Sequence, residues 1–172
     1  MRMLLTRTVV AVSLGLVQAA TLQQLSLDDM IQKSTSIVRG TVRLTGGAMH
    51  GQYIYTHYTI TVVEQWKGTP ATQIDFAVPG GVANGLRETI AGAPTLVDGQ
   101  EYVLYLWKSR SGLVQVIGLS QGLFVSTNGS VARPPINEQM INAQGTGAPD
   151  PGMQMTLNDM RTRVLTALKG NS

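Results

Sequence analysis

Cysteine is absent from this chain of 172 residues. Without thiols the protein has no disulfide, no zinc–thiolate site and no cysteine nucleophile, so a hydrophobic core alone must hold it together. Charged residues are scarce, at 13%, whereas glycine is abundant, with 19 residues. This composition favours a turn-rich β protein over a helical one.

Long apolar runs are also absent. The apolar run Thr8–Val17 has ten residues, half of the roughly 20 that a bilayer span needs. Arg2 and Arg7 precede this run and a small-residue cleavage site ending at Ala19 follows it, an order typical of a secretory signal. We therefore predict a signal peptide over residues 1–19, no membrane span after its cleavage, and an exported protein, either periplasmic or extracellular.

Clusters of lysine and arginine are missing from the remainder of the chain. Removal of Arg2 and Arg7 leaves eleven basic residues against ten acidic ones, a net charge of +1. A nucleic-acid-binding surface needs concentrated positive charge, so the sequence predicts no nucleic-acid partner.

The most informative stretch is Tyr53–Lys67, in which apolar and polar residues alternate. This period of two, with its β-branched and aromatic residues, predicts a β-strand roughly 50 Å long at about 3.3 Å per residue. A strand of that length is expected to bend around the core of a barrel or sandwich. Trp66 is expected to be buried because it shares a face with Ile60 and Val62. This mostly apolar face consists of Ile54, Thr56, Tyr58, Ile60, Val62 and Trp66.

The predicted fold is mainly β: an OB-like antiparallel barrel of five to seven strands, with a short N-terminal helix and a C-terminal helix. Ser26 and Asp29 form a capping box that begins the first helix. The first strand is predicted over Ser36–Leu44, and Gly40 in its middle predicts close approach of a neighbouring backbone or a bulge. Asn128-Gly129 predicts a hairpin turn. The segments are a barrel domain over 20–133, a Pro/Gly-rich linker over 134–155, and an amphipathic helix over 156–170.

Residues that could support catalysis are few. His50 and His57 are seven residues apart, which on one strand means opposite faces and roughly 20 Å of separation, so a shared metal would need a folded-back loop. A G-x-S-x-G sequence occurs at Gly118–Gly122, but it is expected to join two strands, whereas a nucleophile turn joins a strand to a helix. The chain contains no phosphate-binding G-x-x-x-x-G-K-[ST] loop. We predict no catalytic residue, no metal and no cofactor.

The more polar face of the long strand and the glycine-rich loop Val78–Pro94 are the candidate binding surface. Tyrosine combines apolar area with a polar tip and is enriched at interfaces, and long loops often carry function. The alternative is that the tyrosines are cover beneath a loop or helix. The predicted binding residues are Tyr53, Tyr55, His57, Gly80, Gly81 and Asn84.

Three segments resemble the netrin-like/TIMP-like (tissue inhibitor of metalloproteinases) superfamily: Ile37-Val38-Arg39-Gly40, Tyr58–Gly68 and Gly99–Leu106. The segments Ile54–Thr59 and Val78–Gly81 are also similar to uncharacterised exported bacterial proteins. The resemblance covers about residues 26–126 and implies an OB-type barrel with flanking helices. The inhibitors of this superfamily use an N-terminal cysteine on the protease zinc, and this chain has no cysteine.

We therefore expect an exported, non-enzymatic binding module, with a protease or another surface protein as the partner class considered. The alternative is a hydrolase or a metal-dependent enzyme that uses His57. Metal content and a His57 variant would separate these two interpretations.

Overall fold

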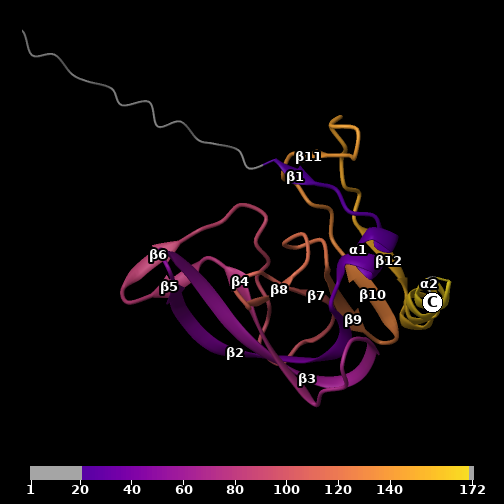
Figure 1. Cartoon of the computed structure of the whole chain (residues 1–172), viewed down its shortest axis with the longest axis horizontal. Coiled ribbons are helices and arrows are strands. Elements are labelled where there is room, and N and C mark those ends of the chain that lie inside the picture. The colour runs from indigo at the N-terminus through magenta and orange to yellow at the C-terminus, as the bar shows by residue number, and fades with distance from the viewer. Residues whose placement is uncertain (1–20, 171–172) are drawn as a thin grey trace, which may run out of the picture.

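A computed structural model describes residues 21–170, so the predicted signal peptide lies outside the described residues. The predicted mainly β fold with two helices is confirmed (Figure 1). Within the described part no helix is long and apolar enough to cross a membrane. The elements are β1 (Leu22–Gln23), α1 (Leu27–Lys33), β2 (Ser36–His50), β3 (Tyr53–Lys67), β4 (Gln73–Pro79), β5 (Gly81–Ala83), β6 (Leu86–Glu88), β7 (Glu101–Lys108), β8 (Val114–Val116), β9 (Leu123–Thr127), β10 (Ser130–Arg133), β11 (Met140–Ile141), β12 (Met153–Thr156) and α2 (Leu157–Lys169).

The main sheet has eight strands in the order β12-β10-β9-β7-β2-β3-β4-β8, and β7 also pairs with β8. All of its pairings are antiparallel except the one between β4 and β8, which is parallel. The pairs β1–β11 and β5–β6 form two small separate sheets. In Figure 1 the β5–β6 hairpin lies at one end of the molecule and α2 at the other.

A long hairpin of β2 and β3, each of 15 residues, is the backbone of this sheet. The strand Tyr53–Lys67 has the predicted bounds, whereas β2 continues beyond its predicted end at residue 44 because residues 46–50 pair with β3. The register shifts between Leu44 and Gly46, a bulge that the sequence did not indicate. The prediction for Gly40 is confirmed, because a side chain there would collide with the backbone of Thr61.

Strand β7 separates two hydrophobic cores, because successive side chains of a strand point to opposite faces. Val103 and Tyr105 belong to a core under the two helices, which also contains Trp66. Trp66 is 7% exposed, which confirms its predicted burial. Tyr102 and Leu104 belong to the other core, which includes Tyr58, Ile60, Phe76, Val78, Val116 and Leu123. With no disulfide available, these two cores carry the stability of the fold.

The two helices lie against each other on the first core. The capping box at the start of α1 is confirmed: the Asp29 N–H donates to Ser26 Oγ, and the Ser26 N–H donates to the Asp29 carboxylate. Lys67, at the end of β3, closes the other end of α1 by donating to the carbonyl oxygens of Ile31 and Gln32, at 2.6 and 2.9 Å.

The interpretation of residues 134–155 as a linker is corrected by the structure. This segment contains β11 and β12, of which β12 pairs with β10 in the main sheet. Arg133 and Asp150 form a two-pronged ion pair of 2.7 and 3.0 Å, and their side chains are 5% and 4% exposed. Phe124 lies beneath the guanidinium, at 5.9 Å. A buried charge pair therefore fastens a segment that has little apolar periodicity.

Breaking this pair should destabilise the protein strongly. Asp150→Ala leaves the Arg133 charge buried without a partner, which costs about 3–5 kcal/mol of unfolding free energy. The double variant Arg133→Met/Asp150→Leu should recover most of that loss. Chemical denaturation measures both, with Asp28→Ala as the control, since its pair with Arg163 is exposed and should contribute about 1 kcal/mol or less. Equal losses for Asp28→Ala and Asp150→Ala would contradict the prediction.

A second charged cluster surrounds Glu64 on β3. The Trp66 indole N–H and the Arg39 guanidinium donate to its carboxylate, at 3.1 and 2.7 Å. These two contacts lower the pKa of Glu64 against the opposing effect of burial, and the charge of Arg161 also lowers it. A lowered pKa in the folded state means that this carboxylate stabilises the protein above its ordinary pKa, and that this contribution is lost as the pH falls.

Glu64→Gln should therefore destabilise the protein near neutral pH and have less effect in acid. The amide retains an acceptor for Trp66 but removes the charge that pairs with Arg39. The measurement is the unfolding free energy of both proteins from pH 7 to pH 3. A difference between them that stays constant over this range would contradict the assignment.

Candidate functional site

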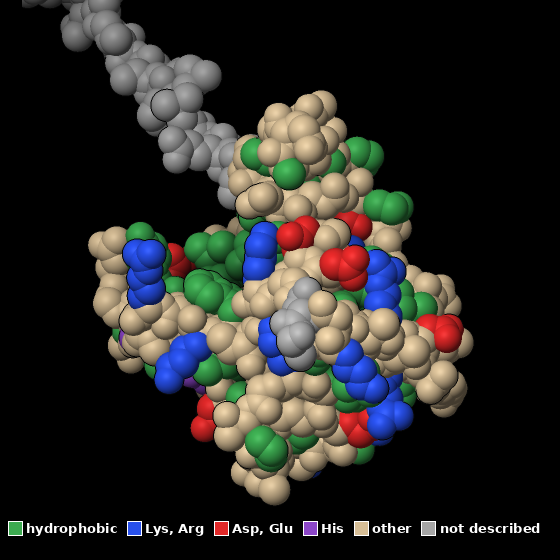
Figure 2. Space-filling view, turned by 45° about the vertical axis from the view of Figure 1, so that its right-hand side comes forward, with side chains coloured by type: hydrophobic (Ala, Val, Ile, Leu, Met, Phe, Trp, Pro, Cys, Tyr) green, Lys and Arg blue, Asp and Glu red, His purple; other side chains and the backbone are tan. Residues whose placement is uncertain are grey.

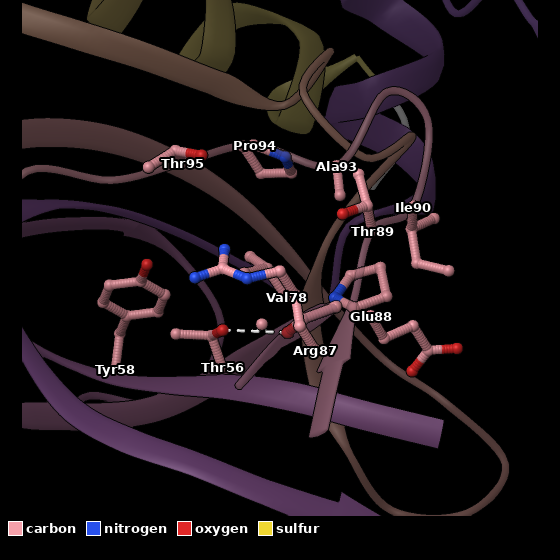
Figure 3. Close-up of a pocket in the computed structure, with 13 residues that line it drawn as sticks. Thr56, Tyr58, Val78, Arg87, Glu88, Thr89, Ile90, Ala93, Pro94 and Thr95 are labelled. Atoms are coloured by element: carbon pink, nitrogen blue, oxygen red, sulfur yellow. Dashed lines mark hydrogen bonds between the residues drawn. The ribbon is translucent and has the colours of Figure 1, made fainter. Parts of the chain in front are cut away.

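A pocket of about 260 Å³ lies where the far part of β3 meets β4 and the β5–β6 hairpin. The segment that leads from β6 towards β7 closes its other side (Figure 3). Its wall combines hydroxyl groups, apolar side chains and a single cation. The lining residues are Thr56, Tyr58, Val78, Pro79, Gly80, Gly81, Arg87, Glu88, Thr89, Ile90, Ala93, Pro94 and Thr95.

Two glycines attach the β5–β6 hairpin to β3. Gly80 and Gly81 follow the end of β4 with φ angles of 89° and 124°, a region that side chains rarely adopt. A Cβ on Gly81 would also collide with the Thr56 hydroxyl. The Gly80 N–H donates to the Ile54 carbonyl at 2.7 Å, and the Thr56 hydroxyl donates to the Gly80 carbonyl at 2.8 Å. Close approach and two hydrogen bonds thus fix one side of the pocket.

The turn of this hairpin is Asn84-Gly85, with φ angles of 51° and 77°. Positive φ at both central residues is typical of a two-residue type I′ turn. The turn pairs Val82 with Arg87 and Gly81 with Glu88. It thereby brings two charged residues of β6 to the rim of the pocket.

Arg87 and Glu88 have different environments. Figure 3 shows the guanidinium of Arg87 reaching back over Thr56 towards Tyr58, whereas the carboxylate of Glu88 points the opposite way. Glu88 Oε2 accepts the Ile54 N–H at 2.6 Å, so this carboxylate is engaged by the backbone of β3. Arg87 is exposed, and among residues 21–170 its guanidinium has neither a hydrogen bond nor an ion pair. The pocket therefore holds one unpaired positive charge.

Hydroxyl groups make up most of the other polar lining. Tyr58 is 5% exposed and stacks on Phe76, with ring centroids 5.6 Å apart. Burial raises the pKa of Tyr58, against the opposing hydrogen bond with the Leu96 backbone, so the phenol remains neutral. Thr89 and Thr95 complete the hydroxyl lining. The Val97 N–H donates to the hydroxyl of Tyr102 at 2.9 Å, which fixes the segment that closes the pocket.

The predicted binding residues divide between two surfaces. Gly80 and Gly81 line the pocket, together with Thr56 and Tyr58 from the face of β3 that was predicted to be apolar. Tyr53, Tyr55 and His57 alternate with those residues and do not line it. Tyr53 is 50% exposed, Tyr55 meets His50 edge-on at 6.0 Å, and His57 is half-buried. Asn84, at the turn of the hairpin, is exposed.

The two histidines lie on the same side of the hairpin, which corrects the expectation of opposite faces. A turn at Gly51-Gln52 separates them, and His50 on β2 lies directly opposite Tyr53 on β3. Within the described part of the chain, no three His, Cys, Asp or Glu side chains are close enough to hold a metal ion.

Thr56 and Tyr58 line the pocket but belong to the face of β3 that was not predicted to bind, and Arg87 lies in the predicted loop without being named among the binding residues. The dipeptide Asn84-Gly85 is the same hairpin signal that correctly predicted the turn at Asn128-Gly129. Applied to Asn84-Gly85, this signal predicts a hairpin in which β5 pairs with β6 and Arg87 lies opposite Val82.

No protein-family model, no curated protein and no solved structure shows significant similarity to this chain. The resemblance to the netrin-like/TIMP-like superfamily therefore stays a prediction from the sequence.

Gly81→Ala should disrupt the pocket through its collision with Thr56. We expect a loss of about 2 kcal/mol or more, from a strained φ and from overpacking. Gly85→Ala is the matched control, because Gly85 also has a positive φ but an added Cβ meets no atom within 4 Å; its loss should be about 1 kcal/mol. The double variant Gly81→Ala/Thr56→Ala removes the hydroxyl and should be more stable than Gly81→Ala. Equal stability of the two would contradict a steric origin.

Proposed function

We propose that this protein is an exported, non-enzymatic binding module that holds its ligand in the pocket between β3, β4 and the β5–β6 hairpin. The observation that carries the proposal is the combination of an apolar wall, several hydroxyl groups and one unpaired guanidinium in a cavity with fixed walls. Ligand sites in proteins are typically concave and apolar, with a few polar groups that orient the ligand. Export rests on the predicted signal peptide.

Binding is favoured over catalysis by the chemistry of the lining. The pocket contains no histidine, its phenol has a raised pKa, and its carboxylate accepts a backbone N–H. General acid–base catalysis uses a group that gains or loses a proton near the working pH. His57, the base considered for an enzymatic alternative, does not line the pocket.

We also propose that the fold is an OB-type barrel. Support comes from the pairing of β2 with β3, β3 with β4, β4 with β8, β8 with β7, and β7 with β2. OB-type barrels have five strands and bind ligands between loops on one side of the barrel. The proposed ligand site would then lie beside the long hairpin of such a barrel.

The charge on the surface gives no support for a nucleic-acid partner. Figure 2 shows lysine and arginine side chains interspersed with aspartate and glutamate on the face that it presents. Binding of an exported protein, a protease included, is compatible with a site of this kind, since a partner could insert one side chain or a chain terminus.

A fragment screen by NMR tests the proposed site. Small acids, amides and sugars added to the ¹⁵N-labelled protein should shift the backbone amides of Gly80, Gly81 and Thr89. Ala93→Leu fills the pocket and should abolish these shifts, whereas Ala91→Leu is an exposed control outside the lining and should preserve them. Shifts confined to Tyr53 and Tyr55, unaffected by Ala93→Leu, would move the binding site to the other face of β3.

A further inference from the structure

Arg87 is the only cation in the lining of the pocket, and its charge is unbalanced there. The lining contains one acidic residue, Glu88, whose carboxylate points away and accepts the Ile54 N–H at 2.6 Å. The other arginines of the described chain, Arg110 excepted, are paired with carboxylates, as Arg39 and Arg133 are. A guanidinium over an apolar wall gains most from a partner that brings negative charge with it.

We propose that the pocket binds the carboxylate of a ligand with a small apolar body, with Arg87 as the anchor. This inference rests on the proposed binding function and names the chemistry of the ligand. A guanidinium is a planar fork that matches the two oxygens of a carboxylate. A single positive charge balances one carboxylate, whereas a phosphate dianion would call for more than one cation.

The remainder of the lining fits the apolar body of such a ligand. Val78, Pro79, Ile90, Ala93 and Pro94 provide apolar wall, and a cavity of about 260 Å³ accommodates a ligand the size of one amino-acid residue. The hydroxyls of Thr89 and Thr95 can donate to a carboxylate oxygen or to a neighbouring amide carbonyl. The neutral phenol of Tyr58 can do the same.

Two sources supply this chemistry: the C-terminal residue of a polypeptide, and a free small carboxylic acid. Both place one carboxylate beside an apolar group of similar size. They differ in what precedes the last residue, because a polypeptide continues out of the pocket through an amide bond.

The test compares matched charged and neutral probes. N-acetyl-leucine and N-acetyl-leucinamide share the same body and differ only in the carboxylate. Both are titrated into the ¹⁵N-labelled protein, and affinities are read from the amides of Gly80, Gly81 and Thr89. We expect the acid to bind at least tenfold more tightly than the amide, and this preference to weaken as salt is added.

Variants of the anchor assign the preference to Arg87. Arg87→Gln should weaken binding of the acid at least tenfold and leave binding of the amide unchanged, and Arg87→Lys should be intermediate because it retains the charge but not the fork. Arg110→Gln is the matched control, an exposed arginine outside the pocket lining. The unfolding midpoint of Arg87→Gln should equal that of the wild type, since Arg87 has no partner to lose.

The two proposals fail in different ways. If acid and amide bind equally, or if Arg87→Gln has no effect while the pocket amides still shift, the carboxylate assignment is overturned and the pocket remains a binding site. If neither probe shifts the pocket amides, the carboxylate assignment is overturned as well, and the fragment screen with Ala93→Leu decides on the pocket itself.

A third probe, the tripeptide Ala-Ala-Leu with a free C-terminus, distinguishes a polypeptide C-terminus from a free small acid as the source of the carboxylate. Tighter binding than N-acetyl-leucine would support polypeptide C-termini, and equal or weaker binding would support small free acids. Either result supports the carboxylate assignment, provided that the C-terminally amidated tripeptide binds at least tenfold more weakly than the free one.

Discussion

The pairing of β2 with β3 along 15-residue strands is the constraint on which the structure depends. Near its base the hairpin pairs with β7 and forms part of the wall between the two cores. Beyond Thr41 the neighbour β7 is no longer present, but β3 still continues next to β4. One face of β3 therefore passes from core to pocket: Ile60 and Tyr58 pack in the core, and Thr56 is half-buried beside the cavity. The pocket lies where the long hairpin continues beyond the part of β2 that pairs with β7.

Two glycines allow the β5–β6 hairpin to pack against the far part of the long β2–β3 hairpin. The β5–β6 hairpin lies against the far part of the long hairpin at two points of close approach, where Gly47 meets the backbone of Val82 and Gly81 meets Thr56. Any larger residue at either point would push the hairpin away and open the cavity. The abundance of glycine, which composition alone associates with turns, here serves tight packing between two hairpins. Because backbone contacts fix the hairpin, the backbone of Arg87 is held at the rim of the pocket before a ligand arrives, and only its exposed side chain has to be ordered on binding.

Short sequence signals predicted those parts of the fold that depend on interactions between residues close together in the sequence. Alternation predicted β3, the capping box at Ser26 predicted the start of α1, and Asn128-Gly129 predicted a hairpin turn. The packing of 134–155 was not predicted, because a buried ion pair between Arg133 and Asp150 and the pairing of β12 with β10 hold a segment whose composition indicates a linker. A polar composition indicates that a segment has no apolar face, but it does not indicate which residues far away in the sequence contact that segment. The site was half predicted for the same reason: Gly80 and Gly81 were identified from their own sequence, whereas the role of Arg87 depends on register across a hairpin.

The tyrosines show how alternation can identify the right strand and the wrong face for a cavity. Tyr53, Tyr55 and His57 were selected because the opposite face of β3 was expected to be filled by the core. That expectation holds at Ile60 and Ile54, which are buried, but not at Thr56, which is half-buried and lines the pocket together with the unpaired guanidinium of Arg87. Near the end of such a long strand, side chains on the inward face border a space that another segment of the chain has to close. In this protein the β5–β6 hairpin supplies the charge of Arg87, so the proposed ligand would contact both the inward face of β3 and this hairpin.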